Sequence, residues 1–399
     1  MGIQVVFYSN FINHHQVLLC DELYKQLNGN FVFVETTDMP IEFKRNGYAD
    51  YSKRSYVLQA WKNEDSYKKA KELAVSADVA MIGSIEPFEF LVLRSRNTNK
   101  LTFEVSERWL KRGIINLLSP NLIKYYYYYY TLFHKKPIYQ LCCSSYAAND
   151  YYFMHSYKDK CYKWAYFTKV DKINIEKECT RKEPVQIMWC SRFLKLKHAE
   201  LPVLMAAKLK DNGYKFILNM YGSGEKLEVT KELVRKHNLE DIVNFCGNLP
   251  NDELLLEMRN HSIFLFTSDQ NEGWGAVANE SMSNGCVLVA SKGIGSSPFL
   301  IENGVTGLLF RSPRKTSGFG KFGLSVDSNA LESLYAKVKY LLDNPDEIKR
   351  LSANAYKSMA EIWNPQNAAE SLLKLINTLK NNELNTIMQG PCSKALPVK

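Results

Sequence analysis

The segment Ile263-Phe-Leu-Phe-Thr-Ser-Asp-Gln-Asn-Glu272-Gly-Trp-Gly-Ala-Val-Ala-Asn-Glu280-Ser-Met-Ser-Asn-Gly285 determines the predicted fold. It opens with four apolar residues, a run short enough for a buried strand, and a polar loop follows. Two glycines then flank Trp274, and helical spacing continues to Gly285, a residue type that suits the position just after a helix. The segment therefore predicts a strand, a glycine-rich turn and a helix.

Such a turn is a potential site for an anion. The first backbone N–H groups of a helix have no partner within it, and the helix dipole favours negative charge there. Glycines also let a ligand approach the backbone closely. Two carboxylates frame the turn, because Glu272 stands directly before it and Glu280 is expected about two turns inside the helix.

The spacing Glu-x7-Glu around Glu-Gly-Trp-Gly resembles the signature of retaining glycosyltransferases of the GT-B fold, family 4 (glycosyl transferases group 1), of the bacterial polysaccharide-biosynthesis type. The resemblance implies that Glu272 lies beside the donor sugar and offers charge to an oxocarbenium-like centre, and that Glu280 binds the nucleotide ribose. For a Glu-x7-Glu spacing alone, the alternative is a capped helix with two solvated glutamates. The resemblance also assigns donor binding to the turn, which comprises Gly273, Trp274, Gly275 and Ala276.

A second part of the resemblance follows an apolar run at 185–190, which predicts a strand. The segment Ser191-Arg-Phe-Leu-Lys-Leu-Lys197 is similar to the family's Arg-Leu…Lys-Gly motif, whose Arg and Lys bind the donor diphosphate. Arg192 and Lys197 match, whereas His198 stands at the usual glycine. A departing diphosphate gains negative charge, which two fixed cations stabilise without a metal. A solvated basic turn is the alternative interpretation.

The resemblance places the nucleotide base near Gly247 and Asn248, at the end of a strand predicted at 242–247. The acceptor would meet the loop after the first strand, where His14 and His15 lie, because ligands in open α/β sheets bind beyond the carboxyl ends of strands. Family members often carry glycines in that loop. A polar loop that caps a helix is therefore the alternative for the two histidines.

Strands alternate with helices through the N-terminal half, which is typical of a doubly wound parallel sheet. The first turn lacks the glycines of a dinucleotide fingerprint, which weighs against a nicotinamide-dependent dehydrogenase. The fold class predicted with the resemblance is α/β, with two Rossmann-like doubly wound GT-B domains that face an inter-domain cleft. The expected N-terminal strands are 3–8, 31–35, 79–82 and 101–105, and the expected helices are 16–27, 65–76 and 107–111.

The predicted domain boundaries follow from the composition along the chain. A polar linker is expected at 171–182 and a flexible insertion at 311–323. The predicted parts are an N-terminal Rossmann-like acceptor domain at 1–172, a C-terminal nucleotide-sugar donor domain at 184–363, a helix crossing back to the N-terminal domain at 364–381, and a disordered tail at 382–399.

Residues 108–136 are basic and aromatic and include six consecutive tyrosines, Tyr125 to Tyr130. Tyrosine and tryptophan favour membrane–water boundaries, and lysine and arginine attract anionic lipids. Family members that build polysaccharides on lipid carriers dock on membranes with such a surface. The alternative is an amphipathic helix whose tyrosines pack on the sheet.

Composition limits the possible compartments and partners. The 399 residues carry a formal net charge of +9, contain 46% apolar residues and include no run long enough to predict a transmembrane helix. The charge suits nucleotide phosphates or anionic lipid headgroups, and no nucleic-acid-binding signature appears. The nine cysteines show no metal-binding spacing, so reduced thiols, no metal and a cytoplasmic location are expected. Peripheral attachment to the inner face of the cell membrane is the second option for the location.

These observations predict a glycosyltransferase that moves a sugar from a nucleotide-sugar donor to a glycan or lipid-linked acceptor. Retention, a hexosyl donor with UDP or GDP, metal independence and a role in capsule or O-antigen synthesis are implied by the resemblance. The donor is a substrate, so no cofactor is expected. The alternatives are a GT-B nucleotide-sugar epimerase or hydrolase, and a non-catalytic nucleotide-sugar-binding module.

Overall fold

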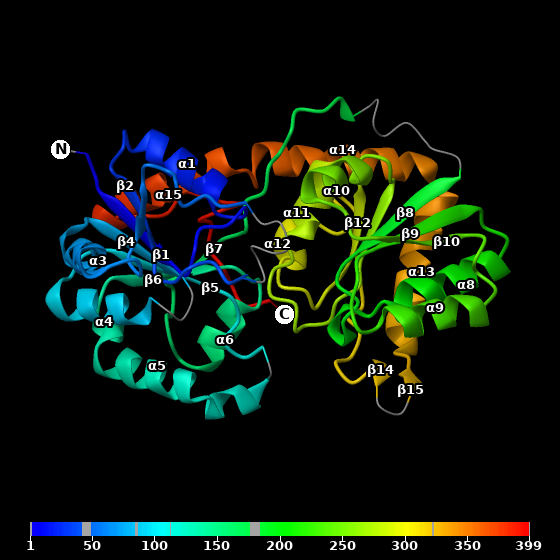
Figure 1. The fold of residues 1–399 in the computed structure, drawn as a ribbon, viewed down its shortest axis with the longest axis horizontal. Coiled ribbons are helices and arrows are strands. Elements are labelled where there is room, and N and C mark those ends of the chain that lie inside the picture. Colours follow the sequence, from blue (N-terminus) through cyan, green and yellow to red (C-terminus); the bar gives the residue numbers. More distant parts are fainter. Residues whose placement is uncertain are drawn as a thin grey trace. The chain divides into compact units, whose positions relative to one another are not determined.

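The chain forms two compact units, each built on its own parallel sheet (Figure 1). This computed structural model describes residues 2–41, 49–83, 87–111, 113–175, 184–320 and 323–398. Unit 1 comprises Met1–Thr168 and Ile362–Lys399, and unit 2 comprises Lys169–Glu361. Unit 1 therefore contains two separate stretches of sequence, whereas unit 2 is continuous.

The sheet of unit 1 has the order β3-β2-β1-β4-β5-β6-β7, and every neighbouring pair is parallel. The central strands are buried on both faces, as expected for a parallel sheet covered by helices. The chain winds outward from β1 to β3 and then restarts at β4, so the order reverses between β1 and β4. The strands are β1 Val5–Ser9, β2 Phe31–Glu35, β3 Val57–Gln59, β4 Val79–Gly83, β5 Thr102–Ser106, β6 Ile138–Cys142 and β7 Cys161–Lys163.

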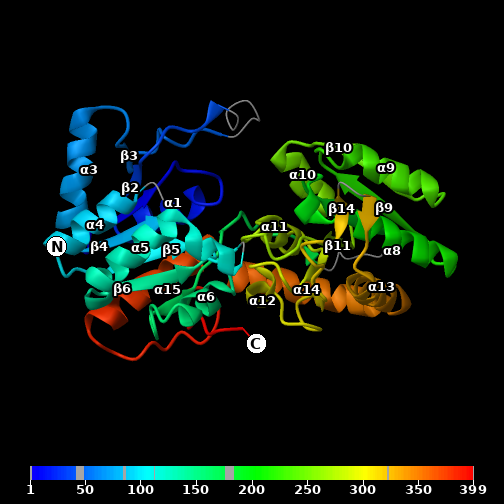
Figure 2. The ribbon, with the colours of Figure 1, turned by 90° about the horizontal axis from the view of Figure 1, so that it is seen from below.

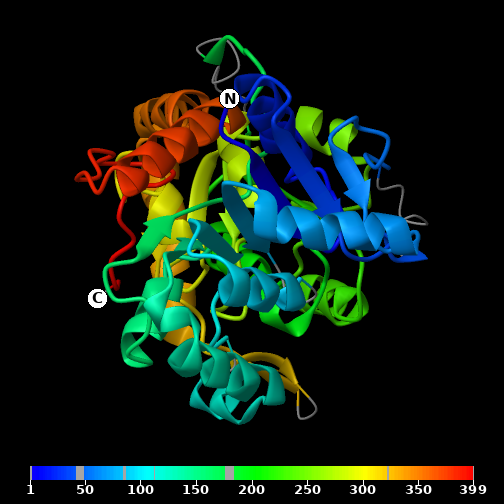
Figure 3. The same cartoon turned by 90° about the vertical axis from the view of Figure 1, so that its left-hand side faces the viewer.

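Helices cover both faces of this sheet. Helix α1 packs against α15, which the C-terminal stretch supplies, and α3 packs against α4. Figure 3 shows α1 and α15 (dark blue and red) along one side and α3 and α4 (light blue and cyan) along the other. The helices are α1 Val17–Gln26, α3 Glu64–Ser76, α4 Phe88–Asn97, α5 Pro120–Thr131, α6 Ala147–Phe153 and α15 Pro365–Lys380, with short 3-10 helices η1 Ile114–Leu118 and η2 Phe133–Lys135.

Unit 2 repeats this architecture with the order β10-β9-β8-β11-β12-β13, again parallel throughout. Here the order reverses between β8 and β11. The strands are β8 Val185–Cys190, β9 Phe216–Tyr221, β10 Val243–Gly247, β11 Ile263–Phe266, β12 Val287–Ser291 and β13 Leu308–Phe310. The prediction of two Rossmann-like α/β domains is confirmed.

The helices of unit 2 also form two layers. In Figure 1, α8, α9 and α13 lie on one side of the sheet and α10, α11 and α14 on the other. An antiparallel hairpin, β14 Gly318–Gly320 with β15 Gly323–Ser325, occupies part of the segment that was expected to be a flexible insertion. The helices are η3 Lys195–Lys197, α8 Glu200–Asp211, α9 Leu227–Lys236, α10 Asn251–Met258, α11 Val277–Ser283, α12 Ser297–Leu300, α13 Ser328–Asp343 and α14 Pro345–Glu361.

The C-terminal segment, for which the sequence predicts disorder, lies against unit 1. Its backbone pairs antiparallel with the edge strand β7: Lys163 N donates to Ser393 O at 2.8 Å, and Ala395 N donates to Cys161 O at 3.0 Å. Asn149 on α6 binds the backbone of Val398, and Figure 2 shows the red segment reaching α6. An edge strand has unpaired backbone groups, which explains why this polar segment is ordered.

A second difference concerns residues 107–111, where the sequence predicts a helix and the structure has a turn. The Asp150 carboxylate accepts hydrogen bonds from the Arg108 guanidinium at 2.8 Å and from the Leu110 backbone N–H at 2.9 Å. A side chain from α6 thus takes the backbone donor that a helix would use. The expected linker falls largely on residues 176–183, which lie outside the described part of the chain.

The buried side chain of Arg94 on α4 joins four segments of unit 1. Its five N–H donors reach the Thr102 hydroxyl and the backbone carbonyls of Ala74, Ala77, Asp78 and Leu101 at 2.8–3.3 Å. Burial lowers the pKa of Arg94 to about 10, so the group is charged at neutral pH. The guanidinium donates to carbonyls at the end of α3 and just before β5.

We expect Arg94→Met to destabilise unit 1 by about 3 kcal/mol, because the carbonyls of Ala74, Ala77 and Asp78 lose the donor that Arg94 supplies. Urea unfolding measures this loss. The exposed neighbour Arg96 is the matched control, and Arg96→Met should cost less than about 1 kcal/mol. Equal midpoints for the two variants would contradict the role given to Arg94.

Candidate functional site

The residues predicted to bind the donor gather where the strand order of unit 2 reverses. β8 and β11 are parallel neighbours, so the loops that follow them emerge at the same edge of the sheet. The loop after β8 carries Arg192 and Lys197, and the loop after β11 carries Glu272. Open α/β sheets bind ligands at such a reversal point, beyond the carboxyl ends of the strands.

Two of these side chains contact each other. The Lys197 ammonium forms an ion pair with Glu272 Oε2, and the Ser268 hydroxyl donates to the same oxygen at 3.0 Å. Only 12% of the Lys197 side chain and 14% of the Glu272 side chain are exposed, so solvent screens this pair weakly. Arg192 lies in the same loop as Lys197, and its side chain is exposed.

Hydrogen bonds from the backbone and from the Thr267 side chain hold the two loops together. The Thr267 hydroxyl donates to the Lys197 carbonyl at 2.7 Å and accepts from the indole N–H of Trp189 at 2.9 Å. Asp269 N donates to the Leu196 carbonyl at 2.9 Å. The turn that carries Lys197 is therefore attached to the loop that carries Glu272 at two successive residues.

His198, at the position where the family motif usually has glycine, keeps a left-handed backbone with φ of 51°. Its buried ring lies between two buried carboxylates: Nδ1 is 2.7 Å from Glu200 Oε1, and Nε2 is 3.4 Å from Asp269 Oδ2. Burial opposes the charge, but the hydrogen bonds with Asp269 and Glu200 outweigh it and raise the pKa of His198 to about 9. Neither carboxylate partner was identified from the sequence.

Glu280 lies nearer the start of its helix than predicted. Helix α11 begins at Val277, so Glu280 belongs to its first turn and not to its second. Burial raises the pKa of Glu280 to about 7, and within the described residues its carboxylate has no hydrogen-bond partner. Burial and the charge of Glu280 raise the pKa of the Cys190 thiol to about 12, while Lys197 opposes that shift. Glu280 and Lys197 therefore both approach the end of β8.

The glycine-rich turn between the two glutamates is closely packed. Gly275 has φ of 74°, and a Cβ there would lie 2.3 Å from the Phe266 ring, so only glycine fits. The Trp274 side chain is buried, and its indole N–H donates to Asn279 Oδ1 at 2.8 Å. Gly273 is also buried, and Ala276 is the cap residue of α11. Trp274 thus anchors the turn inside unit 2.

Gly247 and Asn248 lie at the carboxyl end of β10, on the same edge of the sheet. The Gly247 carbonyl accepts from Gly222 N at 2.7 Å, and Asn248 Nδ2 donates to Ser223 Oγ at 3.0 Å. The loop after β12 adds two residues that the sequence analysis did not single out, Ser296 and Ser297. Their buried hydroxyls have no hydrogen-bond partner in the described part of the chain.

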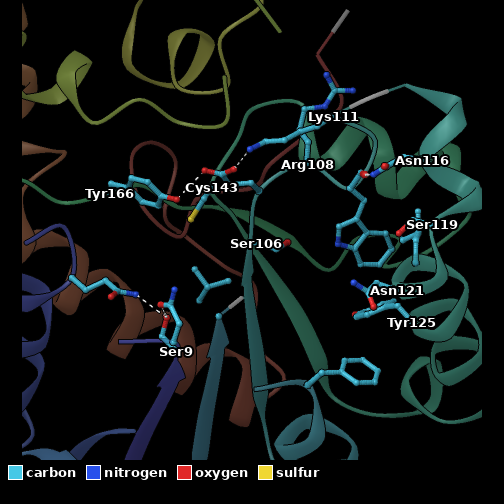
Figure 4. Close-up of a pocket in the computed structure, with 18 of the residues that line it drawn as sticks. Ser9, Ser106, Arg108, Lys111, Asn116, Ser119, Asn121, Tyr125, Cys143 and Tyr166 are labelled. Carbon is cyan, nitrogen blue, oxygen red and sulfur yellow. Dashed lines mark hydrogen bonds and ion pairs between the residues drawn. The ribbon is translucent and has the colours of Figure 1, made fainter. Parts of the chain in front are cut away.

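Unit 1 contains a separate pocket of about 730 Å³ at its own reversal point (Figure 4). The ends of β1, β4, β5 and β6 form its base, through Ser9, Gly83, Ser106 and the adjacent Cys143. The lining includes His15 but not His14. Of the two predicted acceptor residues, the structure therefore brings one to the pocket.

His15 is neutral and has hydrogen-bonding capacity to spare. Burial, with the charge of His14, lowers the pKa of His15 to about 3, and its buried Nδ1 has no hydrogen-bond partner in the residues that the structure describes. Its ring stacks on Tyr166 with centroids 5.4 Å apart. A neutral imidazole here can bind a hydroxyl group of a ligand.

The rest of the pocket lining includes aromatic and charged side chains. Tyr166 donates to Glu107 Oε1 at 2.8 Å, and Lys111 forms an ion pair with the other oxygen of that carboxylate. Trp109 and Tyr125 add ring surfaces, with centroids 4.4 Å apart. Glu107 and Lys111 follow directly after a predicted strand, which is the signal that could have identified them. No cluster of three His, Cys, Asp or Glu side chains suited to a metal occurs among the described residues.

Comparison with known proteins identifies a family match and similar folds. Residues 171–358 match the sequence model of the family Glycosyl transferases group 1. A glycosyltransferase from Rickettsia africae shares 16% identity with a TM-score of 0.63, covering 96% of this chain and 100% of that one. HepE from Anabaena, solved with UDP, shares 12% identity with a TM-score of 0.64, covering 95% and 100%.

The lipopolysaccharide outer core galactosyltransferase WaaB shares 12% identity with a TM-score of 0.65, covering 96% of this chain and 100% of that one. A search of proteins with curated functions finds no match. Identities this low show a common fold, and the family match covers the unit that carries Arg192, Lys197, Glu272 and Glu280. The chain therefore carries a glycosyl transferases group 1 domain in residues 171–358, within the two-unit fold of GT-B glycosyltransferases.

Proposed function

We propose that this protein transfers a sugar from a nucleotide-sugar donor to a glycan or lipid-linked acceptor, with retention at the anomeric carbon. The observation that carries the proposal is the ion pair between Lys197 and Glu272, which joins the loops after β8 and β11 in the unit that matches the family. A cation for a diphosphate and carboxylates for sugar and ribose hydroxyls are what a nucleotide-sugar requires.

The ion pair of Lys197 with Glu272 suggests how the donor enters. The diphosphate competes for the Lys197 ammonium, and its arrival releases the Glu272 carboxylate to accept hydrogen bonds from the sugar. Arg192 supplies a second cation from the same loop. The two positive charges then stabilise the negative charge that grows on the diphosphate as the bond to the sugar breaks. This account needs no metal.

The other parts of the donor have candidate partners nearby. Glu280 suits the ribose, because a buried carboxylate without a partner gains most from two hydroxyl donors. The partnerless hydroxyls of Ser296 and Ser297 add potential donors for the phosphates. HepE was solved with UDP, which supports a uridine nucleotide, and GDP is the second candidate.

The pocket of unit 1 is our candidate for the acceptor. Ring surfaces of Trp109, Tyr125 and Tyr166 suit the apolar faces of sugars, and the neutral His15 suits a hydroxyl. The acceptor oxygen would attack the anomeric carbon on the face from which the diphosphate leaves, which gives retention.

We also propose a membrane-associated role in the synthesis of a cell-surface polysaccharide, such as capsule or O-antigen, and the surface beside this pocket supports the membrane contact. Helix η1 and the start of α5 line the pocket with one side and expose large apolar side chains on the other: Ile114, Ile115, Leu118, Ile123 and Tyr127. None of the described helices is long and apolar enough to span a membrane. We therefore propose that this surface contacts the inner face of the cell membrane peripherally.

The donor assignment predicts a selective loss of diphosphate binding. Arg192→Gln and Lys197→Gln should each lower the affinity for a nucleoside diphosphate by about 10- to 150-fold, because each removes a charged hydrogen-bond partner. The affinity for the bare nucleoside should stay within about twofold. Calorimetry with both ligands measures this difference. Equal losses for both ligands would contradict the assignment.

A transfer assay with a nucleotide-sugar panel completes this test. Glu272→Gln keeps the shape of the side chain but removes its charge, so it should lower turnover and leave bare-nucleotide affinity nearly unchanged. Product formation should require an acceptor. Turnover without an acceptor would indicate an epimerase or hydrolase, and binding without any turnover would indicate a binding module.

Glu280 predicts a pH dependence for nucleotide binding. Ribose hydroxyls bind the ionised carboxylate of Glu280 better than its protonated form. Because the pKa of Glu280 is about 7, the affinity for the nucleotide should rise about tenfold between pH 6 and pH 8. Glu280→Gln should bind more weakly and lose this dependence. Calorimetry of a nucleoside, which has no titrating phosphate, isolates the effect. If the nucleoside affinity of Glu280→Gln changes with pH as steeply as that of the parent, Glu280 is not the group responsible for the pH dependence.

The membrane surface predicts vesicle binding that depends on both apolar and basic side chains. Ile115→Ser with Leu118→Ser, and separately Lys135→Glu, should weaken flotation with anionic vesicles by tenfold or more, since each lost contact costs about 1 kcal/mol or more. Leu256→Ser, at an exposed position of unit 2, is the control. If all these variants bind anionic vesicles as strongly as the parent, this surface does not contact the membrane.

A further inference from the structure

The turn that carries Lys197 ends on a buried, charged histidine. We propose that His198 is a positioning residue: its imidazolium holds this turn against the loop that carries Glu272, so donor diphosphate binding depends on its charge. The inference rests on the proposed function, in which Lys197 binds the diphosphate. His198 itself, being fully buried, does not touch the donor.

The geometry requires a doubly protonated ring. Both nitrogens face carboxylate oxygens, Nδ1 at 2.7 Å from Glu200 and Nε2 at 3.4 Å from Asp269. A carboxylate oxygen accepts hydrogen bonds, and a neutral imidazole has only one N–H to donate, so in the neutral ring the lone pair of one nitrogen would face a carboxylate oxygen. Both carboxylate side chains are only 2% exposed, which makes an unpaired charge there costly.

Asp269 transmits the position of the ring to the catalytic loop. Its backbone N–H donates to the Leu196 carbonyl at 2.9 Å, and its carbonyl accepts from Glu272 N at 3.1 Å. Its second carboxylate oxygen accepts from Asn271 N at 2.7 Å. Asp269 thus contacts the Lys197 turn, the backbone of Glu272 and the imidazolium at once.

The groups that face His198 come from three elements. Glu200 belongs to the first turn of α8, and Asp269 to the loop after β11. The hairpin strand β14 covers the ring through Gly318, where a Cβ would lie 3.3 Å from Nδ1, and its residues Gly318–Gly320 add no ionisable group. The two carboxylates therefore determine the protonation of His198.

The direction of the pH effect follows from these partners. Folding raises the pKa of His198 from its usual value near 6.5 to about 9, so the proton is held in the folded protein and its stabilisation is complete below about pH 6.5. That stabilisation is lost as the pH rises through about 9. Two buried carboxylates then repel each other, and the loops that they join separate.

The test compares His198→Asn with the parent. Asparagine tolerates the left-handed backbone, but its amide carries no charge. We expect about tenfold weaker binding of UDP or GDP, whichever the parent binds, and unchanged binding of the nucleoside. His237→Asn, at a histidine outside this network, should match the parent. A loss shared equally by diphosphate and nucleoside would show a merely structural role and overturn the proposal.

The pH profile of diphosphate affinity supplies a readout that a folding defect would not move. In the parent, affinity should fall above about pH 9. Asp269→Asn removes one carboxylate and lowers the pKa of His198, so the fall in affinity should begin at lower pH. In His198→Asn, the part of the fall that comes from deprotonation of His198 should be absent. If His198→Asn does not fold, Asp269→Asn alone decides.

Two outcomes separate the proposals. If the parent binds the diphosphate and the variants have the same affinity and pH profile, the role of His198 is overturned and the proposed function is unaffected. A parent that binds neither UDP nor GDP would overturn both.

Discussion

The ion pair between Lys197 and Glu272 joins residues 75 positions apart, and it depends on β8 and β11 being parallel neighbours. Because the strand order reverses there, no helix connects those two strands directly, and their loops can approach each other. Hydrogen bonds from Thr267 and Asp269 to the Lys197 turn hold them in contact. Every charged group of the proposed donor site is positioned by this one reversal.

Three carboxylates near the end of β8 and β11 have three different environments. Glu272 pairs with Lys197, Asp269 pairs with His198, and the carboxylate of Glu280 has no partner in the described residues. The unpaired group has its pKa raised to about 7, as desolvation without compensation requires. A largely buried carboxylate of this kind is suited to a ligand that brings hydroxyl donors.

Much of this arrangement could be predicted from the sequence, since buried parallel strands appear as short apolar runs. Val185–Cys190 and Phe31–Glu35 match their predicted bounds for that reason. The turn at 107–111 could not be predicted, because Asp150, which binds its backbone, comes from a different helix. The partners of His198 were missed in the same way: Glu200 lies two residues away, but Asp269 comes from another strand's loop.

The antiparallel pairing of residues 393–395 with β7 has a consequence for biosynthesis. Unit 2 is continuous, so it can fold as soon as its last helix has left the ribosome. Unit 1 must wait for α15 and the segment after it, which are translated about two hundred residues after its seventh strand. During that interval the β7 edge of its sheet is uncovered, and an uncovered strand edge is able to pair with another chain.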